Sequence, residues 1–512
     1  MKVKQRSVCQ TCRNRKLGCD GKRPACSQCV LTGRTCDGYQ SDWTFVSQGT
    51  SGKQSTVRPC QQKVANIKRT VDANSRSSTG RRPQNRQQVE PELLIREESL
   101  SLIRPHGRPC MTDVAEFVRN GYLPEILNTL SDSAHKESRI CGAWVDVLPQ
   151  LPCLASDASV LSKATLALAT LINSQRRSLS RTCDVESPQS YYDAIHKMRG
   201  HIATNGLSLE LLPAIMCLTL VELMLPDSAS ALNMHIHAIR ILFQNYGPGT
   251  FSSGLLHQLF LGFRPVIIAE ALRDRQPTFL ATSIWINIPF SINAVTPTQE
   301  LYSEIAAIPS ILQEIDMLGC VSSTENVPAS RVLIGSLFEA SKRLCAWENA
   351  LGLNIIPSVT SLSDLQPTSI NIPQASPTPI WFPNIPIANG MTHCWSVRVI
   401  CLLEIDKILS RLPNCTGILE GLSEEMNPIS IRAEGDRLAF LICSSMSYLF
   451  QNEMKLFGPA LALFPAQIAY AWFERHRGCN DNSIDFIKGV VAKLVQRGLL
   501  SAPRLVLGES SI

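Results

Sequence analysis

The chain has 512 residues and a formal net charge of +6, with 49 Lys and Arg against 43 Asp and Glu. We find no apolar run of the roughly 18 residues that a membrane span needs, and the nearest, 211–225, contains Pro213 and Glu222. The first seven residues are rich in Lys and Arg and lack the apolar stretch of a signal peptide. These features argue against membrane and secreted classes and predict an intracellular protein.

Six cysteines lie close together at the start of the chain, with the spacing C-x2-C-x6-C-x6-C-x2-C-x6-C. They are Cys9, Cys12, Cys19, Cys26, Cys29 and Cys36. A segment this short cannot build a hydrophobic core, so we expect a metal to hold it folded. Two tetrahedral zinc ions need eight ligand positions in all, and six thiolates fill them if two sulfurs bridge both metals. The spacing therefore predicts two Zn²⁺ ions per chain.

Two other interpretations compete with the two-zinc cluster. A single zinc ion could use Cys9, Cys12, Cys26 and Cys29, which would leave Cys19 and Cys36 as spare thiols. A disulfide-stapled module would also be rich in cysteine, but it normally follows a secretory signal. The remaining 13 cysteines are scattered singly, many among apolar residues, and are expected to be buried, reduced side chains.

Basic residues surround the cysteines. Residues 1–100 hold 19 Lys and Arg against 8 Asp and Glu, whereas the other 412 residues hold 30 against 35. A basic head on a mildly acidic body is typical of a nucleic-acid-binding module joined to another domain. We expect double-stranded DNA as the partner, with phosphate contacts from a set of four basic residues, Arg13, Arg15, Lys22 and Arg23. Lys16 could instead donate to the O6 and N7 acceptors of guanine, or be an ordinary solvated lysine.

The chain divides into three predicted parts: a metal module at 1–45, a flexible linker at 46–109, and an all-helical domain at 110–512. The linker is rich in Ser, Thr, Gln, Asn and Arg and shows no run of heptads for a coiled coil. A proline-rich insert is expected at 353–390. Helical periodicity places helices at about 159–175, 189–204, 209–225, 228–246, 254–273, 298–318, 329–352, 391–412, 430–455, 458–477 and 481–500.

Two segments show a distinct pattern, one helical and one strand-like. In 329–352, apolar residues recur at steps of four and three, which indicates a helix face packed in a core. The segment from Thr282 to Ile288 is the one hint of a β-strand, because Ile284, Ile286 and Ile288 recur at every second position. The predicted fold class is therefore mainly α.

The cysteine pattern, with the basic run Arg13-Asn14-Arg15-Lys16 after the second cysteine, resembles the fungal binuclear zinc cluster family of transcription factors. The resemblance implies that Cys9 and Cys26 are the bridging ligands and that Lys16 contacts bases in a guanine-rich triplet. Gly18 stands where many relatives carry a lysine. The body is similar to the helical regulatory domain that follows such clusters in fungal transcription factors, through diffuse motifs such as Pro277-Thr278-Phe279-Leu280.

We find no enzyme motif: no phosphate-binding P-loop, no dinucleotide-binding G-x-G-x-x-G and no G-x-S-x-G. His235 and His237 lie two residues apart, so on a helix they cannot bind one metal. The sequence predicts a nuclear transcription factor that is not an enzyme, with transcriptional co-regulators as further partners. The resemblance leans towards metabolic or biosynthetic-cluster genes and leaves homodimerisation open. The alternative is a co-regulator whose zinc module binds protein, or nucleic acid without sequence preference.

Overall fold

A computed structural model describes residues 10–15, 19, 26–32, 34 and 36 near the amino terminus. In the rest of the chain it describes 110–124, 143–151, 159–178, 189–226, 229–318, 327–352, 377–410, 427–478 and 481–508. Contacts divide the chain into a first unit, Met1–Arg96, and a second unit, Glu97–Ile512. The predicted linker, 46–109, lies outside the described residues.

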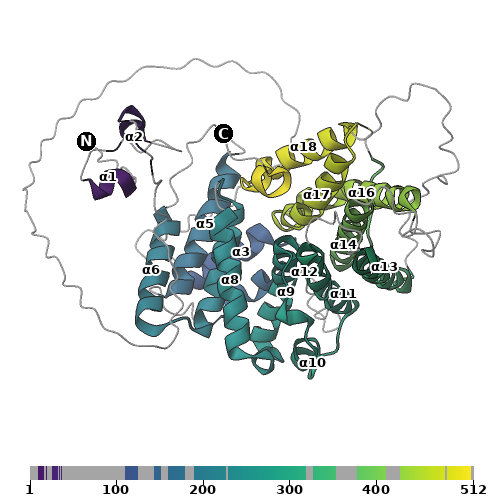
Figure 1. Ribbon diagram of the computed structural model, residues 1–512. Coiled ribbons are helices and arrows are strands. Elements are labelled where there is room, and N and C mark those ends of the chain that lie inside the picture. Colours follow the sequence, from purple (N-terminus) through teal and green to yellow (C-terminus); the bar gives the residue numbers. More distant parts are fainter. Residues whose placement is uncertain are drawn as a thin grey trace, which may run out of the picture. The chain divides into compact units, whose positions relative to one another are not determined.

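The first unit contains two short helices that pack on each other, α1 (Gln10–Asn14) and α2 (Ser27–Leu31). The second unit is built from longer helices: α3 (Met111–Tyr122), α5 (Val160–Ser178), α6 (Gln189–Asn205), α7 (Leu212–Leu223), α8 (Ala229–Tyr246), α9 (Gly254–Asp274), α10 (Ser283–Asn287), α11 (Pro297–Ala306), α12 (Ile308–Met317), α13 (Val327–Ala350), α14 (Ile385–Ser410), α16 (Pro428–Leu449), α17 (Phe457–Arg475) and α18 (Asp481–Gln496). Figure 1 labels most of these helices.

Short segments of 3-10 or π helix lie between and beside them: η2 (Ala143–Gln150), η4 (Leu209–Leu211), η5 (Pro248–Phe251), η6 (Phe279–Ala281), η7 (Ile288–Phe290), η11 (Asn452–Met454) and η12 (Pro503–Leu507). The described residues contain no strand, which confirms the mainly α fold class.

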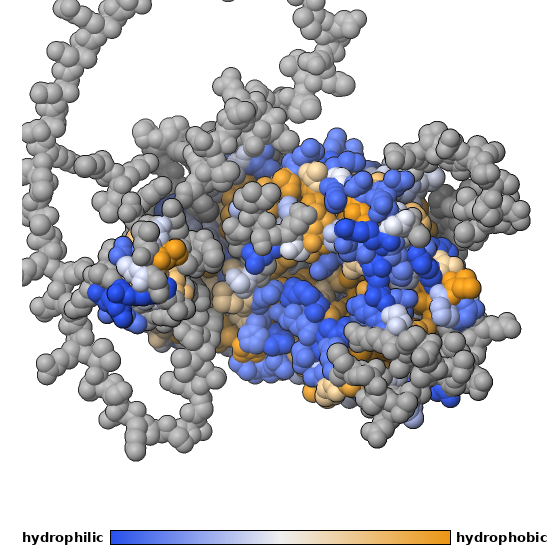
Figure 2. Space-filling model, turned by 45° about the horizontal axis from the view of Figure 1, so that its top comes forward, coloured by the Kyte–Doolittle hydropathy of each residue, from blue (hydrophilic) through white to orange (hydrophobic). Residues whose placement is uncertain are grey.

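One hydrophobic core runs through the second unit, from Met111 in α3 to Val506 in η12. Helix α14 lies near its centre and packs against α11, α13, α16 and α17, while α5 packs against α3, α6 and α7. On the face shown in Figure 2, hydrophilic side chains cover much of the helical body, with hydrophobic ones between them. Amphipathic helices therefore bury their apolar faces in a shared core, as the periodicity predicted.

The helices expected from periodicity are confirmed, with four corrections. The segment 298–318 is two helices, α11 and α12, because Pro309 starts a new helix in its first turn. The supposed strand at 282–288 is helix α10, which begins at Ser283. Helix α14 begins at Ile385, inside the expected proline-rich insert, so the insert ends before residue 390. Helices α3 and η2 were not predicted.

Helix α9 is long and apolar enough to cross a membrane, which the search for apolar runs overlooked. In the fold, 72% of the relevant window is buried. Core helices of globular proteins pass the same test of length and composition, so this helix is weak evidence for a membrane span. Its buried Arg264 donates hydrogen bonds to the carbonyl and side-chain oxygens of Gln299, at 3.0 and 2.9 Å.

A buried ion-pair network joins three helices of the body. Arg398 of α14, with a side chain 6% exposed, lies 2.7 Å from Glu348 of α13 and 2.6 Å from Glu434 of α16. Arg437 lies on the same helix as Glu434 and pairs with that carboxylate at 2.7 Å. The Arg437 side chain is 36% exposed. The positive charge of Arg398 therefore balances the negative charges of Glu348 and Glu434 inside the fold.

Substituting Arg398→Met should destabilise the body, because it leaves the half-buried Glu348 and Glu434 without their shared cation. We expect a loss of about 3 kcal/mol in the free energy of unfolding, measured by urea denaturation followed by circular dichroism. The matched control is Arg437→Met, which removes a more exposed partner of the same carboxylate and should cost about 1 kcal/mol or less. Equal losses of stability in the two variants would contradict the role of Arg398 as the cation that compensates both carboxylates.

Candidate metal centre and nucleic-acid interface

Three cysteine sulfur atoms of the first unit lie within 4.8 Å of one another. Cys12 is supplied by α1, Cys29 by α2, and Cys26 caps the amino end of α2. The Sγ of Cys12 is 3.6 Å from that of Cys26 and 4.0 Å from that of Cys29. Two thiolates on one tetrahedral zinc ion, each about 2.3 Å from the metal, are separated by about 3.8 Å. The described sulfurs therefore have the spacing of ligands to a single zinc ion.

The local structure of α2 holds its two sulfurs in place. Cys26 has an extended backbone, and its Sγ accepts a hydrogen bond from the backbone N–H of Cys29 at 3.3 Å. The C-x2-C spacing places both sulfurs one helical turn apart on the same side of α2, as the sequence predicts.

Cys19 and Cys36 belong to the same cluster. Cys19 is buried with Cys12, Cys26 and Cys29, and the half-buried Cys36 packs against them. This placement argues against the single-zinc interpretation, in which both would be spare thiols. The disulfide interpretation does not fit the described geometry, since the Sγ of Cys12 lies 3.6 and 4.0 Å from those of Cys26 and Cys29, whereas bonded sulfurs would be about 2.05 Å apart. Cys9 lies outside the described residues.

The structure places only part of the predicted DNA-contacting set. Arg13 lies in α1, and Arg15 is exposed directly after the end of this helix. Lys16, Lys22 and Arg23 lie outside the described residues. Arg34, which the sequence did not single out, is also exposed, and its backbone N–H donates to the carbonyl of Cys29 at 2.9 Å. Its position two residues before the last cysteine of the pattern is the signal that would have identified it.

The cysteines of the body are chemically different from those of the cluster. Cys217, Cys394, Cys401 and Cys443 are buried singly among apolar side chains, as predicted. Burial raises the pKa of the Cys217, Cys401 and Cys443 thiols to about 12, so that these side chains stay protonated and do not act as ligands. His235 is half-buried and His237 is exposed, which confirms that the two histidines face different surroundings.

Comparisons with known proteins agree with this geometry. Residues 7–42 match the model of the fungal Zn(2)-Cys(6) binuclear cluster domain. The chain is 54% identical over 35 residues to the transcription regulator lscL of Purpureocillium lilacinum, covering 7% of this chain and 8% of that protein. It is 41% identical over 59 residues to the aspercryptin biosynthesis cluster-specific transcription regulator atnN of Emericella nidulans, covering 12% of this chain and 8% of that protein. No solved structure matches the chain.

The amino-terminal segment is thus a fungal-type binuclear zinc cluster domain, and its cofactor is a pair of zinc ions. The matched segments span less than a tenth of each relative, so this finding applies to the module alone.

The full-length chain should contain two zinc ions per molecule when measured by atomic emission after exhaustive dialysis. Cys26→Ser should lower this value, because a serine hydroxyl is a poor replacement for a buried thiolate beside Cys12 and Cys29. The matched control is Cys110→Ser, which changes an exposed cysteine of the second unit and should leave the zinc content at two. One zinc ion per wild-type chain would contradict the prediction.

Proposed function

We propose that this protein is a sequence-specific DNA-binding transcription factor. The single observation that carries the proposal is the match of residues 7–42 to the fungal binuclear cluster domain, together with the clustered sulfurs of Cys12, Cys26 and Cys29. Two relatives of this segment are named as transcription regulators, one of them specific to a biosynthetic gene cluster. The excess of basic residues in the first hundred supports a negatively charged partner.

In this proposal all six cysteines are zinc ligands, and Cys9 and Cys26 bridge the two metals. Six thiolates with two bridges fill every position of two tetrahedral ions, so no position is open for a water molecule. The zinc ions accordingly stabilise the fold of the module and supply no Lewis-acid chemistry to a substrate. The chain is not an enzyme in this assignment, in line with the regulator names of its relatives.

DNA recognition is divided between two kinds of contact. Lys16 donates to guanine acceptors of a short guanine-rich triplet in the major groove, where each base pair shows a distinct pattern of donors and acceptors. Phosphate contacts come from the predicted set of Arg13, Arg15, Lys22 and Arg23, and the exposed Arg34 joins them. These contacts provide affinity and position the module, and Lys16 provides the sequence preference.

The second unit is, in this proposal, a helical regulatory domain that meets transcriptional co-regulators in the nucleus. A triplet offers little specificity, so occupancy of a promoter needs a second module, either from a homodimer or from neighbouring contacts. By analogy with the biosynthetic-cluster regulator among its relatives, the target genes belong to secondary metabolism.

Lys16→Ala should reduce the affinity for the preferred duplex by about 1–3 kcal/mol and leave the affinity for random DNA almost unchanged, because only base contacts carry sequence information. Fluorescence anisotropy with both duplexes at one fixed salt concentration measures this difference. If the ratio of the two affinities does not change, Lys16 does not read bases. A zinc module that prefers no sequence at all would favour the alternative of a protein-interaction co-regulator.

Arg13→Ala should weaken binding to the preferred and random duplexes by similar factors, because a phosphate contact is independent of sequence. The slope of log affinity against log salt concentration should become shallower by about 1. Lys493→Ala, which removes one positive charge from an exposed position of α18 in the second unit, is the control and should leave the slope unchanged. An unchanged slope in Arg13→Ala would contradict the phosphate contact.

A further inference from the structure

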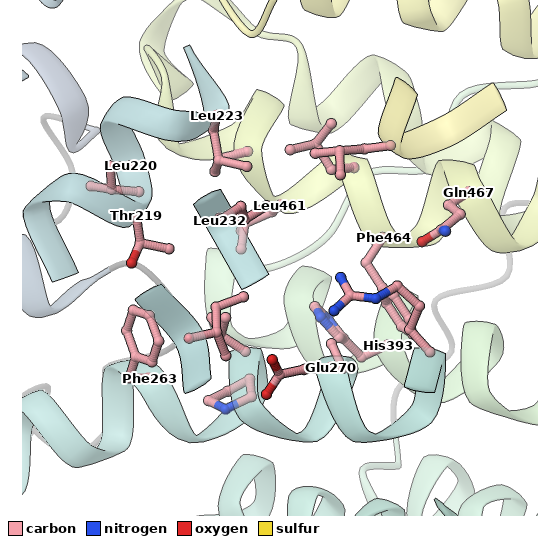
Figure 3. A pocket seen from close by; sticks show the side chains of 18 of the residues that line it. Thr219, Leu220, Leu223, Leu232, Phe263, Glu270, His393, Leu461, Phe464 and Gln467 are labelled. Atoms are coloured by element: carbon pink, nitrogen blue, oxygen red, sulfur yellow. The ribbon is translucent and has the colours of Figure 1, made fainter. Parts of the chain in front are cut away.

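A cavity of about 180 Å³ lies inside the second unit, between α7, α8, α9 and α17. Its wall is mainly apolar, with Leu220, Leu223, Leu232, Phe263, Leu461 and Phe464 among the lining residues, and Figure 3 labels all six. Protein interiors are close-packed, and voids much larger than a water molecule are few. A void of roughly 150 Å³ is already large enough to hold benzene. This cavity therefore has room for one aromatic ring with a short substituent.

Glu270 of α9 places a carboxyl group in this apolar wall. Glu270 is only 5% exposed. Figure 3 shows its side chain on the α9 side of the pocket, opposite Leu223. No hydrogen bond or ion pair joins it to the described residues, so its carboxylate oxygens are left to solvent in the pocket. A bound molecule with a donor group can replace that solvent and form a hydrogen bond with a carboxylate that is otherwise enclosed by apolar side chains.

His393 of α14 supplies a second acceptor to the same cavity. Its Nδ1 lies 2.8 Å from the carbonyl oxygen of Asn389, and because a carbonyl only accepts, Nδ1 carries the proton and donates it. Burial lowers the pKa of His393 to about 4, so the ring is neutral at physiological pH. Nε2 is then an unprotonated acceptor, and the ring is held in place by stacking on Phe464, with centroids 5.5 Å apart.

The charged side chains near Glu270 do not pair with its carboxylate, so a hydrogen-bond donor can still bind there. Burial raises the pKa of Glu270 to about 7, against the opposing effect of Arg240 and Arg273, with Asp274 raising it further. Arg273 lines the cavity but is engaged at 3.1 Å by the Oδ1 of Asp274 and is partly exposed, as is Gln467. These two side chains form a polar edge through which a small molecule can enter. The interior itself offers two acceptors and a hydrophobic wall.

We infer that this cavity binds a small apolar molecule, about the size of one aromatic ring, whose amine or hydroxyl group donates hydrogen bonds to Glu270 and His393. The apolar body replaces solvent against the leucine and phenylalanine side chains, and the donor satisfies the buried acceptors. The site lies wholly within the second unit and does not depend on DNA binding by the first.

Four probes of equal ring size test this inference on the full-length chain: benzylamine, benzyl alcohol, toluene and benzoate. Titration monitored by ligand-observed NMR should give measurable affinity for benzylamine and benzyl alcohol. Toluene lacks the donor and should bind at least about tenfold more weakly, since a hydrogen bond to a charged or buried acceptor contributes about that much. Benzoate brings an anion to Glu270 and should not bind.

Two variants, each with a matched control, locate the binding in this cavity. Glu270→Met removes the carboxyl group and should abolish the preference for benzylamine over toluene, whereas Glu314→Met, at an exposed position of α12, should preserve it. Ala269→Leu extends a side chain into the cavity and should remove binding of all four probes, whereas Ala350→Leu, at an exposed position of α13, should not.

The inference is overturned if the wild-type chain binds none of the probes, or binds toluene as tightly as benzylamine. It is also overturned if Ala269→Leu, with its helical content unchanged by circular dichroism, binds them all as before. Should Glu270→Met fail to fold, the order of the probe affinities on the wild-type chain and the result for Ala269→Leu still decide it.

Discussion

The helical body depends on one constraint: helix α14 is buried almost all round, so its polar side chains are paired inside the protein, although Asn389 Oδ1 and Arg398 Nε themselves have no hydrogen-bond partner. Asn389 donates to the hydroxyl of Tyr302 in α11 at 3.0 Å. Arg398 pairs with carboxylates of α13 and α16. Glu404 lies 3.0 Å from Arg275, which follows α9, and 2.8 Å from Lys407 on its own helix. A rotation of α14 would break these pairs together, so the pairs fix the orientation of α14 and the positions of its neighbours.

The described residues of the first unit show no comparable set of contacts. Its two helices are five residues each, and its buried side chains are cysteines, with Cys26 fully buried and Cys12 and Cys29 nearly so. Hydrophobic burial on this scale cannot offset the conformational entropy of the chain, whereas bonds between thiolates and zinc can. Two Zn²⁺ ions and six thiolates carry a formal charge of −2, but residues 1–50 hold nine Lys and Arg against three Asp. The surrounding basic residues therefore set the charge that a partner meets.

The features that could be predicted from the sequence are those set by regular spacing along a single helix. The stripe of α13 and the C-x2-C pair of Cys26 and Cys29 come from spacing along one helix, and both are present in the described part of the chain. The alternation of Ile284, Ile286 and Ile288 was misleading because Thr282 precedes a helix and only the intervening Trp285 is buried in the core. The ion pairs of Arg398 and the acceptors of the cavity could not be predicted, since they join residues far apart in the chain. Glu270 and His393 stand 123 positions apart, and only the packing of the helices brings both to one wall.

The burial of cysteines in the body has a consequence for the chemistry of the whole chain. Oxidants and electrophiles react with thiolates that solvent can reach, and the thiols of Cys217, Cys401 and Cys443 are both protonated and enclosed. Among the described cysteines, those that solvent reaches are the half-buried Cys36 of the zinc module and, in the body, the exposed Cys110 and the half-buried Cys345. Oxidative damage would release metal from the module while the body stays folded. Loss of the metal would therefore unfold the module before it affects the helical body.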